Sequence, residues 1–124
     1  MLNNEKPIIT QTNREKIASI LPIAREDIAA LLEEELERAT IVSDEDLPTD
    51  VVSMDSTVKF LDLETNKESI VQLVFPQDTN IAENKISILT PVGSALIGLR
   101  VGQTINWPFP NGKMKQLKVT SVTK

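Results

Sequence analysis

The chain has 124 residues, of which 40% are hydrophobic and 25% are charged, and this composition is typical of a soluble protein with one compact core. It contains no cysteine and no histidine, which excludes disulfides, thiolate catalysis, cysteine-based zinc sites and histidine as a general base or metal ligand. No apolar run approaches the roughly 20 residues of a membrane-spanning helix, and no glycine-rich nucleotide-binding loop is present. We therefore expect neither a membrane association nor a cofactor.

The charged residues are unevenly distributed. Residues 1–50 hold five Lys or Arg and twelve Asp or Glu, whereas residues 51–124 hold eight and six. Nucleic-acid phosphates would repel the acidic first segment, so we expect no direct binding to DNA or RNA and a basic protein surface as the partner. A solvated acidic helix face would account for the same charges. The first residues lack the basic and apolar stretches of a signal peptide, so we expect a cytoplasmic protein, and we expect a monomer.

Two helices are the first predicted elements. Thr12-Asn13-Arg14-Glu15 fits a capping box, which predicts that a helix begins there. Ile17, Ile20 and Leu21 follow at helical spacing and form one apolar face. Pro22 cannot continue this helix without loss of a hydrogen bond, but it suits the first position of the next one.

The second helix is predicted over residues 23–42. Its apolar face comprises Ile28, Leu31, Leu32, Leu36 and Ala39, and Glu33, Glu34, Glu35, Glu37 and Arg38 lie largely on the other faces. With a break of one or two residues, the pattern predicts a short antiparallel helical hairpin, a coiled-coil stub whose first helix is much the shorter. The alternative is a single helix with a kink at Pro22. Residues 43–48 are polar and end at a proline, which predicts a hinge between an N-terminal hairpin (1–46) and a second domain (47–124).

After the hinge the hydrophobic period changes from 3.6 to 2, as in strands. Strands are predicted over residues 57–63, 70–75, 85–89, 104–107 and 116–122. Asn66 tolerates the positive φ of a hairpin turn after the first strand, and Asn111-Gly112 supplies the last turn. Trp107 is expected to pack in the core or to contribute to an interface. The fold class is therefore α+β, with the helical hairpin followed by an antiparallel β-sheet domain that contains one short helix.

The stretch from Ile88 to Trp107 is the most distinctive part of the chain. It predicts a strand end, a Pro91-Val92-Gly93 turn, a short apolar helical turn that stops at Gly98, and a Val101-Gly102 turn into another strand. The order and spacing of these motifs closely resemble the C-terminal domain of the GreA/GreB transcription elongation factors. That resemblance implies an FKBP-like fold and docking on RNA polymerase.

Two further segments resemble one subfamily, the regulators of nucleoside diphosphate kinase (Rnk). Leu47–Phe60 is similar to the first strand of the domain in that subfamily, and Leu73-Val74-Phe75-Pro76 is similar to its Leu-Val-Tyr-Pro strand end. The resemblance covers residues 12 to 122 and is weakest before Leu47. It implies an effect on nucleoside diphosphate kinase, yet a chain without histidine cannot itself be a kinase of the phosphohistidine type.

The resemblance also implies that one turn contacts the rim of the polymerase. The turn comprises Leu89, Thr90, Pro91, Val92 and Gly93. The family often has a polar or acidic residue before Ser-Pro, so Leu89 would replace a polar contact with an apolar one. If Leu89 is exposed, Leu89→Asp or Pro91→Ala should change the affinity for polymerase and leave folding intact. The alternative is a turn that only positions the helical segment at 95–99.

A second candidate site is the tip of the predicted hairpin. The resembled cleavage factors use acidic residues at the tip of a long coiled coil to help hold a catalytic magnesium ion. The tip in this chain would comprise Pro22, Arg25, Glu26 and Asp27. Adjacent helical residues point about 100° apart, so the two carboxylates converge poorly on one ion. They would instead stabilise the helix dipole, and we expect no metal site.

The expected function is that of a non-enzymatic transcription regulator. It would bind RNA polymerase near the secondary channel and compete with Gre-type factors without stimulating transcript cleavage, because the predicted hairpin is much shorter than theirs. The alternative is a cleavage-stimulating elongation factor in which Glu26, Asp27 or the acidic run 33–37 supplies carboxylates for the metal. A third possibility is an interaction domain that binds some other protein through the Leu89 turn. Prolyl isomerase activity is not expected, because the chain has few aromatic residues.

Overall fold

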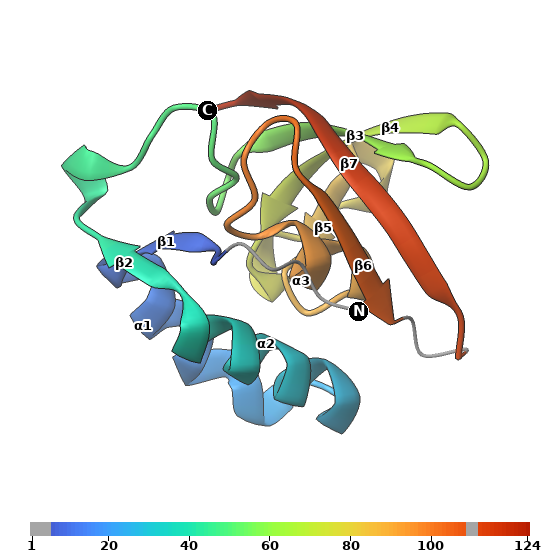
Figure 1. Cartoon of the computed structure of the whole chain (residues 1–124). Coiled ribbons are helices and arrows are strands. Elements are labelled where there is room, and N and C mark those ends of the chain that lie inside the picture. The colour runs from blue at the N-terminus through green and yellow to red at the C-terminus, as the bar shows by residue number, and fades with distance from the viewer. Residues whose placement is uncertain (1–5, 109–111) are drawn as a thin grey trace.

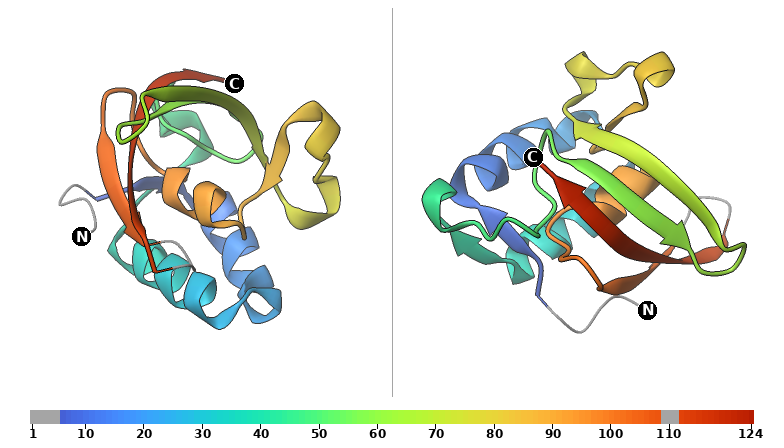
Figure 2. Two further views of the ribbon diagram at one scale, coloured as in Figure 1. Left: turned by 90° about the vertical axis from the view of Figure 1, so that its right-hand side faces the viewer. Right: turned by 90° about the horizontal axis from the view of Figure 1, so that it is seen from above.

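A five-stranded sheet with helices against one of its faces forms the body of the computed structural model, which describes residues 6–108 and 112–124 (Figures 1 and 2). The α-helices are α1 (Gln11–Ile20), α2 (Glu26–Arg38) and α3 (Pro91–Leu96). The strands are β1 (Ile8–Thr10), β2 (Thr40–Val42), β3 (Thr57–Asp62), β4 (Lys67–Val74), β5 (Lys85–Ser87), β6 (Thr104–Pro108) and β7 (Met114–Thr123). Short 3₁₀ turns lie at η1 (Leu21–Ile23), η2 (Asp44–Asp46), η3 (Pro76–Asp78) and η4 (Ile81–Glu83). The prediction of a mixed helix and sheet fold is confirmed.

The sheet has the strand order β5-β4-β3-β7-β6. The β3–β4 turn is the predicted one, with Asn66 at a φ of 60°, whereas Asn111 of the predicted last turn lies outside the described residues. The prediction of an antiparallel sheet is wrong at one edge, because β5 pairs with β4 in parallel and places Lys85 opposite Gln72. Residues 75–84, which include η3 and η4, lead from the end of β4 back to a position beside that strand, so that β5 runs in the same direction as β4. Alternation within a strand carries no information about the direction of its neighbour, so periodicity could not show this.

The first helix is capped two residues before the predicted capping threonine. Thr10 lies at the end of β1 in an extended conformation, and its side-chain oxygen accepts a hydrogen bond of 3.1 Å from the Asn13 amide. Thr12 is instead inside α1, where its hydroxyl donates to Asp44 at 3.3 Å. Both threonines offer a capping oxygen, and the pairing of β1 with β2 decided between them.

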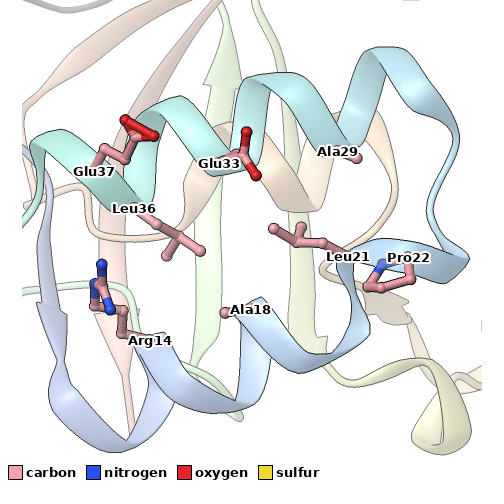
Figure 3. Close-up of a pocket in the computed structure, with 8 residues that line it drawn as sticks. All are labelled: Arg14, Ala18, Leu21, Pro22, Ala29, Glu33, Leu36 and Glu37. Atoms are coloured by element: carbon pink, nitrogen blue, oxygen red, sulfur yellow. The ribbon is translucent and has the colours of Figure 1, made fainter.

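The second helix is shorter than residues 23–42. It begins at Glu26, after the 3₁₀ turn that contains Pro22, and it ends at Arg38. It ends there because Thr40–Val42 form β2, which pairs in parallel with β1. The two helices therefore have similar lengths, 10 and 13 residues, and they run in opposite directions (Figure 3).

One hydrophobic cluster joins the helices to the sheet. Ile17 of α1 and Leu32 of α2 are fully buried in the same cluster as Val58 and Leu73 of the sheet and Leu96 of α3. The apolar faces predicted for the two helices thus belong to the same core as the sheet and α3. The domain boundary at residues 46 and 47 remains a prediction, with a shared core on both sides of it.

One acidic residue departs from the expected polar face of the second helix. The Glu35 side chain is only 5% exposed, and its carboxylate accepts a 3.0 Å hydrogen bond from Arg38 one turn later. Burial of a carboxylate is costly unless it is paired, and this ion pair supplies the partner. Glu35 therefore lies on the buried side of α2 with Leu32 and Leu36, and not on the expected polar face.

Candidate functional site

The segment from Ser87 to Gly93 covers the end of β5, its connection to α3 and the first turn of α3, and it is closely hydrogen-bonded. The prediction of a turn at residues 91–93 is wrong in this respect, because these residues are helical. Thr90 is the N-cap of α3, and its side-chain oxygen accepts a 3.1 Å hydrogen bond from the Gly93 amide. The same hydroxyl donates to the Ser87 carbonyl at 2.7 Å, and the Leu89 amide donates to the Ser87 hydroxyl at 2.9 Å. Pro91 occupies the first helical position, where its missing N–H costs nothing. The backbone of the turn is therefore held in one conformation.

The two apolar side chains of this turn are not free surface groups. Leu89 and Val92 are half-buried and pack against the hydrophobic core. Leu89→Asp would place a charge against that core, so it would alter folding as well as any binding. Pro91, also half-buried, is the cleaner position at which to test contact with a partner.

Gly93 is required by a close approach of two backbone segments. A Cβ at this position would lie 2.3 Å from the Ser87 carbonyl oxygen and 3.1 Å from the Ile88 Cα. Any side chain would therefore push the start of α3 away from the end of β5. The glycine was predictable from the sequence, whereas Ser87 was missed, although its hydroxyl and carbonyl both accept hydrogen bonds in this segment. A serine three residues before a helix-capping threonine is the signal that could have found it.

Replacement of Thr90 by alanine should lower the free energy of unfolding by about 0.5–2 kcal/mol, because it leaves the Gly93 amide without its capping oxygen. Urea denaturation followed by circular dichroism measures the change. Thr90→Ser is the matched control, since it keeps the hydroxyl, and it should recover most of the loss. Equal destabilisation by both variants would contradict a capping role.

The predicted tip residues lie in and just after the turn between the two helices, residues 21–25, which we call the interhelical turn. Arg25 pairs with Asp27 at 3.3 Å, and the other carboxylate oxygen of Asp27 accepts a 2.9 Å hydrogen bond from the Ile28 amide. Asp27 is thus engaged at the start of α2, while Glu26 is exposed. In the part of the chain that the structure describes, no group of three or more acidic side chains is placed to hold a metal ion.

The interhelical turn adjoins a groove of about 540 Å³ between α1 and α2. Leu21 of η1 and Leu36 of α2 point into it, Arg14 lies at its α1 side, and Glu33 and Glu37 lie along α2 (Figure 3). The groove has an apolar floor and one acidic wall. Of the predicted tip residues only Pro22 lines it, together with Glu33 and Glu37 of the acidic run named for the alternative function.

A surface ion pair joins the segment after α3 to the segment before β3. Arg100 donates to both carboxylate oxygens of Asp50, at 3.1 and 3.2 Å. These hydrogen bonds hold the pKa of the Asp50 carboxyl below its ordinary value. Both side chains are partly exposed, so the pair orients the chain before β3 more than it stabilises the fold.

The sequence prediction did not single out Ile23, which is 72% exposed in the interhelical turn. Its position outside the apolar stripe of the first helix, directly after Pro22, was the available signal. The side chain of Trp107 lies outside the part of the structure that is described. No helix among residues 6–108 and 112–124 is both long and apolar enough to cross a bilayer.

Several known proteins are similar to this chain. Residues 47–124 match the family model described as transcription elongation factor, GreA/GreB, C-term. The regulator of nucleoside diphosphate kinase of Escherichia coli strain K12 is 42% identical over 92 residues, which cover 74% of this chain and 68% of that protein. The transcription elongation factor GreA of Acetivibrio thermocellus is 38% identical over 93 residues, which cover 75% of this chain and 58% of GreA.

A solved structure agrees over nearly the whole chain. The prokaryotic transcription elongation factor GreA/GreB from Nitrosomonas europaea superposes with a TM-score of 0.78 at 38% identity. The match covers 98% of this chain and 100% of that one. The similarity therefore includes the helices at the N-terminus as well as the sheet.

Proposed function

The chain belongs to the GreA/GreB transcription elongation factor family, and on that premise we propose that it binds RNA polymerase near the secondary channel and competes there with Gre-type factors. In this proposal it is not an enzyme and does not stimulate transcript cleavage. Its β-sheet domain, of the FKBP-like type, would dock at the rim of the polymerase through the turn at residues 89–93. Regulation would follow from occupancy of the channel, in proportion to concentration over dissociation constant.

The observation that carries the proposal is the combination of family membership with a rigid turn at the expected place. The Ser87 and Thr90 hydrogen bonds hold residues 87–93 in one conformation before any partner binds. A preordered turn loses little conformational entropy on binding, which favours a docking role.

The length of the helices supports occupancy without cleavage. The 13 residues of α2 extend about 20 Å. Burial of Leu32 and Ile17 in a core shared with the sheet keeps both helices against the domain. A carboxylate at their far end would then reach only a short distance into a channel, and Asp27 is already engaged by Arg25.

The charge of the helices bears on how the polymerase would be contacted. The acidic helices would be repelled by nucleic acid, so the contact would be made through protein surfaces and not through DNA or RNA. We propose a cytoplasmic monomer as the active form.

The exposed Glu26 favours one alternative function, a cleavage-stimulating factor that lends a carboxylate to the polymerase metal. Competition of the purified protein with a labelled GreA for core RNA polymerase, run together with a transcript-cleavage assay on stalled complexes, separates the two. Displacement without cleavage is the expected result. Displacement with cleavage would establish the alternative, and no displacement would refute polymerase binding at this site.

Pro91→Ala should raise the dissociation constant for polymerase by roughly three- to tenfold, because it removes two apolar carbons from the proposed contact. The matched control is Pro76→Ala, which also replaces a half-buried proline at the start of a short helix but lies outside the turn. Titration of labelled polymerase with both variants measures the difference. If the two variants bind equally well, the turn is not part of the interface.

A further inference from the structure

Ile23 is a large apolar side chain in an unusual position. It is 72% exposed, although Leu21 and Ala24 on either side of Pro22-Ile23 are half-buried. Among the described residues only Ile81 is a comparably exposed large apolar side chain, at 75%. Exposure of this kind contributes nothing to the core, and it leaves an apolar surface available for a partner.

The exposure of Ile23 does not come from a loose loop. The interhelical turn is a 3₁₀ turn in which the Ala24 amide donates to the Leu21 carbonyl at 3.0 Å, and Pro22 restricts the backbone at its start. On its other side the Ala29 amide donates to the Arg25 carbonyl at 2.8 Å. Ile23 is thus presented from a hydrogen-bonded turn, which lowers the entropy lost when a partner covers it.

The charges next to Ile23 indicate the chemistry of that partner. Glu26 is exposed and makes no ion pair with any residue that the structure describes. Arg25 is paired internally with Asp27, so it does not offset Glu26. A surface that covers Ile23 would therefore bring an apolar pocket together with a lysine or arginine at its border.

We propose that Ile23 is the apolar anchor through which the interhelical turn binds RNA polymerase, in an apolar pocket bordered by a basic side chain that meets Glu26. This inference rests on the proposed function and adds to it a second contact, distinct from the turn at residues 89–93. The two side chains would have different roles. Burial of Ile23 would supply affinity, and Glu26 would orient the complex and speed its association.

Ile23→Ser tests the anchor in the competition assay with labelled GreA. Loss of a buried isoleucine side chain should raise the dissociation constant by roughly ten- to a hundredfold. Ile81→Ser is the matched control, because Ile81 also lies in a three-residue 3₁₀ turn and is equally exposed. It should leave the affinity unchanged, and thermal unfolding should show that both variants are as stable as the wild type.

Glu26→Gln tests the electrostatic part in the same assay. It should weaken binding at low salt and reduce the dependence of the dissociation constant on salt, whereas Ile23→Ser should weaken binding equally at all salt concentrations. Unchanged affinity of Ile23→Ser, or an equal loss in Ile81→Ser, would overturn the anchor while polymerase binding still holds. Failure of the wild-type protein to displace GreA would overturn both.

Discussion

Gly98→Ala should lower the free energy of unfolding by about 2–5 kcal/mol, from backbone strain and steric overlap together. Gly98 has a φ of 82°, which an L-residue adopts only at a cost. A Cβ there would lie 2.5 Å from the Pro7 Cβ and 3.2 Å from the Ile8 nitrogen. The Ile8 amide donates to the Gly98 carbonyl at 3.1 Å, so a shift at this point also disturbs the attachment of β1.

Gly102→Ala is the control that separates the two causes. Gly102 also has a positive φ, 92°, but among the described residues, its two chain neighbours aside, no atom lies within 4 Å of the position of its Cβ. Alanine at this site should cost only the backbone term, about 1–2 kcal/mol. Urea denaturation of both variants gives the comparison. If Gly98→Ala costs no more than Gly102→Ala, the contact with Pro7 is not a restraint on the N-terminal strand.

Leu32→Ala should lower the free energy of unfolding by about 2–5 kcal/mol, as expected for removal of a fully buried leucine side chain. Leu32 is completely buried on α2, in the cluster that also contains Val58 and Leu96. Its loss should therefore weaken the sheet and the helices together. Circular dichroism of the helices and NMR amide signals from β3 and β7, followed in the same urea titration, should show coincident transitions.

Leu31→Ala is the control for this variant, because Leu31 is its neighbour on α2 but is only half-buried. A smaller loss of stability is expected there. Early melting of the helices in Leu32→Ala, with the β3 and β7 signals retained, would contradict a cooperative core. It would instead favour the predicted division into residues 1–46 and 47–124 as independent units.

Several elements could be predicted because their signals are local. The period-2 pattern located β3, and the preference of Asn66 for a positive φ located the turn that follows it. The motifs from Pro91 to Gly98 predicted a short helix and carried the resemblance to the family, but they placed it at residues 95–99, whereas α3 spans Pro91–Leu96 and includes the predicted turn at residues 91–93. In each case the residues that determine the conformation lie within a few positions of one another.

The candidate site was only partly predictable. The sequence pointed to the turn at residues 89–93, but it could not show that Leu89 packs against the core, because that contact involves residues distant in the chain. Pro22 marked Ile23 as lying outside the apolar stripe of the first helix, but the sequence could not show that its side chain is exposed, since exposure depends on what the rest of the fold leaves uncovered.

The sequence by itself determined the fold class, the family and the approximate positions of the helices and main strands, because periodicity, capping and turn chemistry act between near neighbours. Only the tertiary structure decided that Thr10 and not Thr12 caps α1, that α2 ends at Arg38, and that β5 runs parallel to β4. These outcomes depend on pairing between distant segments, above all β1 with β2. Such pairings are selected by the free energy of the whole chain, which no local pattern records.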